Sequence, residues 1–175
     1  MYRMIRRRRR TSDTDYKRRV ELLKGGMPRL VVRKSNRSIR LQIVEYSGES
    51  DHVIASVNSS ELRTMGWEPR SNIPTAYLTG LLISKKYGAK DAVLDSGLYK
   101  PIKGAVIFAA AKGAQDGGMK LRANIEFDEN RLNGGHIESY AKENPKAYSA
   151  YAKAKFDVSA MKSKFESVKK MILTK

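Results

Sequence analysis

Hydrophobic and polar residues alternate early in the chain in a way that predicts a β-hairpin. A first strand is expected over residues 30–34 and a second over residues 37–46, where every second residue from Ile39 to Ile43 is aliphatic. Ser35 and Asn36 are expected to form a tight turn between them, because asparagine tolerates a positive φ. Since side chains alternate between the two faces of a strand, one face of this hairpin is expected to be buried.

Hydrophobic residues recur every three or four positions in several other segments, which predicts helices. These helices cover residues 15–24, 74–87 and 102–115, and a last helix in which Val158, Met161, Phe165, Val168 and Ile172 form one apolar stripe. Asp13 or Thr14 is expected to cap the first helix, and Gly25 is expected to end it.

Two further strands are predicted over residues 53–57 and 91–95, and the helix between them suggests a strand–helix–strand crossover. Asn58 and Glu61 have the spacing of a capping box, which opens a short helix. Residues 119–122 are a candidate edge strand. The pattern therefore predicts an α/β fold with a mixed, mostly antiparallel sheet, flanking helices, a basic N-terminal arm and a helical C-terminal tail.

Composition limits the possible size of the core, the domain organisation and the kinds of site. The chain has 175 residues, of which 41% are hydrophobic, so it can bury one core. We expect an extended basic arm with a short helix (residues 1–27), an α/β core domain (28–127) and a helical C-terminal extension (128–175). No apolar stretch approaches the roughly 20 residues of a membrane span, so no membrane partner is expected. The absence of cysteine excludes disulfides and thiolate metal sites, and no cofactor or metal is expected.

Positive charge is concentrated at both ends of the chain. Of the formal net charge of +17, residues 1–40 carry +12, residues 41–140 carry −1 and residues 141–175 carry +6. The arginine run from Arg6 to Arg10 repels itself, so we expect the first dozen or so residues to stay extended and disordered until an anion neutralises them. A targeting tag and a membrane-surface segment are alternatives. The run leads into a capped helix and has few apolar neighbours, so nucleic acid is favoured over both.

The tip of the hairpin is a second candidate for anion binding. It is expected to place Arg33, Lys34, Arg37 and Arg40 close together, with the side chains of the turn as neutral donors. The alternative is a solvated edge whose charges discourage pairing between sheets. Beside so basic an arm, contact with RNA or DNA is favoured.

A third candidate is the loop from Asp95 to Gly104, which follows a strand and precedes a helix. Ligands of open α/β sheets bind at this end of the strands, and Lys100, Lys103 and the helix-start amides favour an anion there. Tyr99 could stack on a base. The alternative is an ordinary connection whose glycines serve the turn.

An enzymatic alternative rests on three acids. Asp91, Asp95 and Asp116 could suggest a metal-dependent nuclease, since the first two lie four residues apart on one strand. The sequence has no nucleophile–base arrangement and no dinucleotide or phosphate-loop fingerprint, so catalysis is not favoured.

Several segments, taken in order over about residues 3–140, resemble one family. They are TDYKRR at 14–19, PRLVVRKSN at 28–36, SSEL at 59–62, PTAYLTG at 74–80, AVLDSGL at 92–98 and GAVIFAAAKGA at 104–114. They are similar to the archaeal and eukaryal branch of the large-subunit ribosomal protein that binds 5S rRNA, and the length favours the archaeal type. Ser96 departs from the pattern, because the family usually has an aliphatic residue there.

The resemblance implies a non-enzymatic cytoplasmic protein that is a monomer within the ribosome. It also implies binding to 5S rRNA, contact of the arm with 23S rRNA, and neighbouring ribosomal proteins in the central protuberance of the large subunit. A free RNA-binding factor or RNA chaperone, and less so a metal-dependent nuclease, remain the alternatives. The predicted RNA-binding residues are Arg3, Arg6, Arg7, Arg8, Arg9, Arg10, Tyr16, Lys17, Arg18, Arg19, Arg29, Arg33, Lys34, Ser35, Asn36, Arg37, Arg40, Gly97, Tyr99, Lys100, Lys103 and Gly104.

Overall fold

A five-stranded sheet lies at the centre of the computed structural model, which describes residues 4–5, 7–11, 13–144 and 147–174. In spatial order the strands are β3 (Asp51–Asn58), β2 (Ile39–Tyr46), β1 (Arg29–Lys34), β4 (Asp91–Asp95) and β5 (Lys120–Leu121). The long β1–β2 and β2–β3 ladders are antiparallel, and the short β1–β4 and β4–β5 ladders are parallel. The predicted mixed, mostly antiparallel sheet is confirmed.

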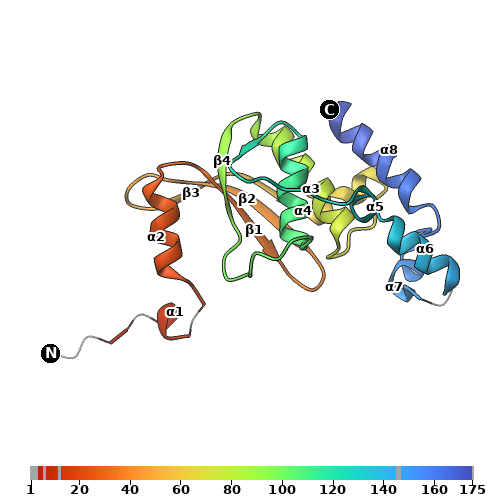
Figure 1. The fold of residues 1–175 in the computed structure, drawn as a ribbon, viewed down its shortest axis with the longest axis horizontal. Helices are drawn as coiled ribbons and strands as arrows, with labels where there is room; N and C mark the ends of the chain where they lie inside the picture. Colours follow the sequence, from red (N-terminus) through yellow and green to blue (C-terminus); the bar gives the residue numbers. More distant parts are fainter. Residues whose placement is uncertain (1–3, 6, 12, 145–146, 175) are drawn as a thin grey trace.

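The helices follow the predicted order, and Figure 1 shows them spread from the arm at one end to the C-terminal helices at the other. They are α1 (Arg7–Arg10), α2 (Tyr16–Lys24), the 3₁₀ helix η1 (Ser59–Met65), α3 (Ile73–Tyr87), α4 (Val106–Asp116), α5 (Glu129–Leu132), α6 (Gly135–Glu143), α7 (Ser149–Lys153) and α8 (Met161–Thr174). Within the described ranges, none of them is both long and apolar enough to cross a bilayer.

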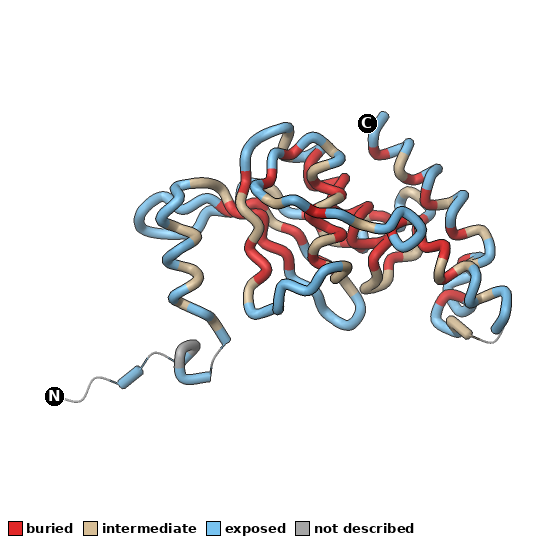
Figure 2. The backbone as a smooth tube through the Cα atoms, viewed as in Figure 1, coloured by how far each residue is buried: buried red, intermediate tan, exposed pale blue. Residues whose placement is uncertain are grey.

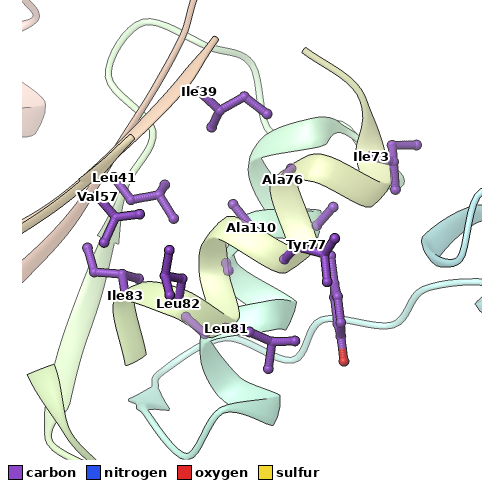
Figure 3. Close-up of a cluster of buried hydrophobic side chains, with 14 of the residues drawn as sticks. Ile39, Leu41, Val57, Ile73, Ala76, Tyr77, Leu81, Leu82, Ile83 and Ala110 are labelled. Atoms are coloured by element: carbon purple, nitrogen blue, oxygen red, sulfur yellow. The ribbon is translucent and has the colours of Figure 1, made fainter. Parts of the chain in front are cut away.

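Helix α3 packs on one face of the sheet and is buried from its first residue almost to its last turn. Figure 3 shows Leu41 and Val57 of the strands beside Leu82 and Ile83 of α3, and Ile39 nearer to the Ala76 end of that helix. Figure 2 shows buried residues concentrated in the sheet, α3 and α4, while the described residues of the arm are exposed or half-buried. The aliphatic face predicted for the hairpin is therefore the face that meets the core.

Helices α3 and α4 cross in close contact through glycines. A Cβ added at Gly80 would collide with the carbonyl oxygen of Ala110, and one added at Gly113 would collide with the carbonyl oxygen of Tyr77. Only glycine lets two helix backbones approach so closely.

The C-terminal helix α8 joins the same core. Met161, Phe165, Val168 and Ile172 are buried, as their spacing predicted. The ring of Phe165 lies 6.2 Å from that of Trp67 in an edge-to-face arrangement.

Several predicted boundaries are wrong for local reasons. Helix α2 is capped by Asp15, which accepts a hydrogen bond from the Arg18 backbone N–H, and not by Asp13 or Thr14. Strand β2 begins at Ile39 and not at position 37, since residues 35–38 close a wider turn. Helix α4 begins at Val106 and not at position 102, because Gly104 adopts φ 77° and ends the preceding turn outside the helical region.

Two other expectations need adjustment. The capping box at Asn58 and Glu61 is present, but the helix that it opens is 3₁₀. Strands β3 and β4, which flank α3, are not neighbours, because β2 and β1 lie between them. The crossover therefore spans the sheet, and the adjacent parallel strands are β1 with β4 and β4 with β5.

Candidate nucleic-acid interface

The face of the sheet opposite the core carries polar side chains and is approached by α2. Leu30 and Val32 are fully buried on the core side, while Arg29, Val31 and Arg33 alternate with them on the other side. A groove of about 500 Å³ separates α2 from this face. Its floor and walls come from α2, from β1, β2 and β3, and from the loop after β4.

A chain of alternating arginines and aspartates crosses this face. Arg19 of α2 pairs with Asp51 of β3 (Nη2–Oδ2 2.8 Å), and Arg29 of β1 pairs with the other oxygen of Asp51 (Nη2–Oδ1 2.7 Å). Arg29 also reaches Asp95 at the end of β4 (Nη1–Oδ2 3.3 Å), and Asp95 in turn pairs with Arg33 (Oδ1–Nη2 3.2 Å). We call these five residues the arginine–aspartate chain.

Helix α2 is also attached to the loop that follows β4. Arg18 donates one hydrogen bond to the carbonyl oxygen of Gly97 (3.1 Å) and another to the hydroxyl of Ser96 (2.9 Å). Gly97 in turn donates its backbone N–H to Asp95 Oδ1 (2.8 Å). The departure at Ser96 thus supplies a hydroxyl acceptor for Arg18 that an aliphatic side chain lacks.

The hairpin tip is built by side chains of the turn itself. Ser35 Oγ accepts hydrogen bonds from the backbone N–H groups of Arg37 (3.4 Å) and Ser38 (3.0 Å). Ser71 Oγ donates to the Ser35 carbonyl oxygen (2.7 Å), which fastens the tip to the loop before α3. Asn36 has a negative φ, so the predicted use of a positive φ is wrong, because the four-residue turn does not require one.

Arg33 and Arg40 lie directly opposite each other on the paired strands β1 and β2, so the expected proximity of these two cations is confirmed. The loop after β4 joins them, because the Tyr99 hydroxyl donates to the Lys34 carbonyl oxygen (2.8 Å). The structure therefore brings α2, the hairpin tip and the loop of residues 96–99 to one side of the sheet.

Other predicted residues fall outside this cluster. Lys100 and Lys103 are exposed, and no side-chain hydrogen bond within the described ranges ties them to the hairpin. Gly104 lies in the same connection, two residues before α4 begins. Lys17 is exposed on α2, whereas Tyr16 is half-buried there.

The arm differs in part from its expected extended form. Arg7–Arg10 form one helical turn, α1, which ends where the backbone N–H and hydroxyl of Thr11 both donate to the Arg7 carbonyl oxygen (2.9 and 3.0 Å). Figure 1 shows this turn standing away from the sheet. Arg3 and Arg6 lie outside the described residues, as do the side chains of Arg8 and Arg9.

Arg29 is placed differently from the other predicted RNA-binding arginines. It is 4% exposed, and both of its amino groups pair with carboxylates. Its Nε is buried without a hydrogen-bond partner in the described part of the chain. In this structure Arg29 is an internal residue that is closed to a phosphate.

The three acids considered for a nuclease do not converge. Asp95 is engaged by Arg29 and Arg33, while Asp116 at the end of α4 accepts a hydrogen bond from Tyr77 and pairs with Lys112. Burial, followed by the Asp116 carboxylate, raises the pKa of Tyr77, so its hydroxyl stays protonated. These carboxylates serve packing and helix ends in separate places.

Sequence reasoning missed three residues that build this interface. Asp51 connects two arginines, and Ser71 fastens the hairpin tip. Ser96 was noticed only as a departure from the family pattern. None of them belongs to a local motif, since their partners lie 22 to 78 positions away along the chain.

The balance of charge on this side of the molecule favours an anion. Arg40, opposite Arg33 on this face, and Arg37, in the turn, are exposed and, among the described residues, have no carboxylate within ion-pair distance. Lys34 is exposed too, but it alternates with Arg33 and so starts from the other face of β1. The arginine–aspartate chain adds three cations for two anions. A rigid α/β domain with such a cationic face and a basic arm is typical of nucleic-acid-binding proteins.

Similarity to known proteins shows which family of nucleic-acid-binding proteins the chain resembles. Residues 1–90 match the family model described as ribosomal large subunit proteins 60S L5, and 50S L18. The chain is 45% identical over 153 residues to large ribosomal subunit protein uL18 of Methanococcus maripaludis, which covers 84% of this chain and 79% of that protein. It is 45% identical over 145 residues to uL18 of Haloarcula marismortui (79% of this chain, 78% of that protein). It is 39% identical over 185 residues to uL18 of Thermofilum pendens (98% of this chain, 94% of that protein).

The chain belongs to this family of large-subunit ribosomal proteins, in its archaeal form. It is therefore a structural protein of the ribosome, located in the cytoplasm, and not an enzyme.

Proposed function

We propose that this chain binds 5S rRNA and helps to hold it against 23S rRNA and the neighbouring ribosomal proteins of the central protuberance. The observation that carries the proposal is the convergence of α2, the hairpin tip and the loop of residues 96–99 on one cationic side of the sheet. The cations of α2 and of the hairpin, which are distant in sequence, lie on either side of this loop, so together they can contact several phosphates of one folded RNA at once.

The hairpin tip supplies the exposed cations of this surface. Arg37 lies in a turn that is held by its own serines and by Ser71, and Lys34 and Arg40 lie in the strands that flank this turn. These side chains therefore start from an ordered backbone and lose less conformational entropy on binding. Contacts of this kind to phosphates set the position of a protein on RNA. Tyr99, which is 41% exposed, is tied to the hairpin through the Lys34 carbonyl oxygen and can stack on an unpaired base.

The arm contributes affinity in a different way. Helix α1 stands away from the domain, and we propose that the arginines of the arm follow a phosphate backbone, that of 23S rRNA. Lys17, Arg18 and Arg19 on α2, together with Lys100 and Lys103 in the loop, extend the same surface toward both RNAs. Double-stranded RNA is recognised by its shape and 2′-hydroxyls, which suits a rigid face better than a base-reading helix.

The test compares two RNAs with two matched variants. Filter binding to 5S rRNA and to an unrelated RNA duplex is measured for the native protein, for the triple variant K34A/R37A/R40A, and for a control that removes three other exposed lysines, K120A/K153A/K170A. The hairpin variant is expected to lose roughly tenfold or more in affinity for 5S rRNA beyond its loss for the duplex, because pre-positioned contacts carry specificity. The control variant loses the same three positive charges as the hairpin variant. It is expected to bind both RNAs more weakly by a similar factor, which is smaller than the loss of the hairpin variant for 5S rRNA.

Equal losses for both RNAs in the hairpin variant would mean that the hairpin is only another patch of charge. Native protein that shows no preference for 5S rRNA, and that does not co-sediment with large subunits, would instead favour a free RNA-binding factor.

A further inference from the structure

Two carboxylates lie in the middle of the cationic side of the sheet, where they should oppose RNA. Asp51 and Asp95 are the anions of the arginine–aspartate chain, and both line the groove between α2 and the sheet. An uncompensated carboxylate near phosphates costs affinity. Their presence at this place calls for a role other than opposing the charge of RNA.

Each carboxylate joins elements that would otherwise be independent. Asp51 accepts from Arg19 of α2 through one oxygen and from Arg29 of β1 through the other. Asp95 accepts from Arg29 through one oxygen, and from Arg33 and the Gly97 backbone N–H through the other. The buried guanidinium of Arg29 connects the two aspartates, so the helix, the hairpin and the loop share one continuous network.

The network also determines which edge of Arg33 faces outward. Its Nη1 donates to the carbonyl oxygens of Val32 (2.9 Å) and Asp95 (3.0 Å), and its Nη2 donates to Asp95 Oδ1 (3.2 Å). Of the five N–H donors of a guanidinium, this leaves the Nε–H and one Nη2–H. Those two lie parallel on one edge and fit a phosphate in a bidentate way. The side chain is 45% exposed, and within the described part of the chain its Nε makes no hydrogen bond.

We propose that Asp51 and Asp95 are positioning residues for RNA binding: they hold α2 and the outward edge of Arg33 in the geometry that distinguishes 5S rRNA from other RNA. This inference rests on the proposed function, since it explains how the same surface gains its selectivity. Its consequence runs against simple electrostatics. Removing the negative charge of either aspartate should weaken selective binding, although it makes the protein more positive.

The experiment compares D95N with E21Q in filter binding to 5S rRNA and to an unrelated RNA duplex. Both variants remove one negative charge, but Glu21 is exposed on α2 and, within the described part of the chain, makes no ion pair. E21Q is expected to raise both affinities by no more than about twofold, because exposed charges are screened by salt. D95N is expected to lower affinity for 5S rRNA by roughly tenfold, the scale of one lost charge-assisted hydrogen bond, and to leave duplex binding by the arm unchanged.

The two affinities together separate the explanations. A D95N protein whose affinities both rise, as in E21Q, would show that Asp95 acts only as an opposing charge. Equal loss for both RNAs would show a general structural role without selectivity. Either outcome overturns the proposal.

Thermal melting shows whether D95N folds. If D95N does not fold, D51N is used in its place. Asp51 is 29% exposed, so its replacement leaves less buried positive charge without a partner. D51N is expected to lose the preference for 5S rRNA in the same way, and a D51N that behaves like E21Q overturns the proposal. Native protein without any preference for 5S rRNA would contradict the proposed function itself. A native preference that both variants keep would contradict only the positioning role.

Discussion

At the scale of single residues, the glycines between α3 and α4 set the distance between the two main helices of the core. Replacing Gly113 by alanine removes a residue of poor helix propensity, which alone would stabilise α4 by about 1 kcal/mol. The new Cβ would fall well inside contact distance of the Tyr77 carbonyl oxygen, which belongs to rigid backbone. The collision outweighs the gain in propensity, because the helices must separate to relieve it.

We therefore expect G113A to lower the free energy of unfolding by about 1–3 kcal/mol, measured by urea denaturation. The control is G25A at the end of α2, where a Cβ would lie 3.7 Å from its nearest neighbour and the backbone is helical. That variant is expected to stay within about 0.5 kcal/mol of the native protein. A G113A protein as stable as G25A would mean that the helices adjust freely at their crossing.

At the scale of elements, a single carboxylate joins α6 to the start of α8. Glu138 accepts a hydrogen bond from Lys142 one turn later on α6 (2.9 Å) and another from the backbone N–H of Lys162 on α8 (3.2 Å). These donors lower the pKa of Glu138 below the ordinary glutamate value of 4.5. The folded state thus favours the ionised form.

Because this pKa is lowered on folding, the stabilisation is present above pH 4.5 and is lost as the pH falls through the folded value. At neutral pH, E138Q is expected to lower the free energy of unfolding by about 0.5–1 kcal/mol, the size of a lost helix cap and ion pair. The gap between native protein and E138Q should shrink as the pH falls below 4.5. Glu143, exposed at the end of α6, provides the control E143Q, which should stay within about 0.5 kcal/mol of the native protein at neutral pH. A gap that stays constant with pH would contradict the role of the ionised carboxylate.

At the scale of the whole molecule, affinity for RNA is expected to divide between the arm and the folded face. Replacing all five arginines from Arg6 to Arg10 by alanine should weaken binding to 5S rRNA and to an unrelated duplex alike. Each lost phosphate contact lowers the slope of log K against log[salt] by roughly 0.7–0.9, so the loss of several contacts should flatten it by about 2–4 units. Filter binding at four salt concentrations measures this slope. A variant that loses only 5S rRNA binding, with an unchanged slope, would show that the arm reads a specific structure.

The C-terminal helices illustrate how the whole molecule shares one core. Helix α8 places Phe165 against Trp67 and Tyr77, and Lys85 of α3 donates to the Leu173 carbonyl oxygen at the end of α8 (2.9 Å). The residues before α8 contribute as well, since the rings of Phe156 and Trp67 lie 5.5 Å apart. The lysines of the tail consequently project from a segment that is fixed to the domain.

Much of the fold could be predicted from the sequence because the signals are local. The alternation from Ile39 to Ile43 follows from the geometry of a strand, and the stripe from Met161 to Ile172 follows from that of a helix. The turn at residues 35–38 and the start of α4 were misplaced by a few residues. The pattern of hydrophobic and polar residues does not distinguish between the possible boundaries at these two places. The side-chain hydrogen bonds of Ser35 fix the first boundary, and the positive φ of Gly104 fixes the second.

The sequence by itself determined the class of fold, the concentration of charge at the ends and the family to which the chain belongs, since all three depend on the order of residue types. Only the tertiary structure decided what each arginine does. Arg29 and Arg37 lie eight positions apart on the same hairpin, yet Arg29 is buried and Arg37 is exposed. The difference arises because Asp51 and Asp95, 22 and 66 positions away, meet Arg29 when the strands pair, and no local pattern encodes that meeting.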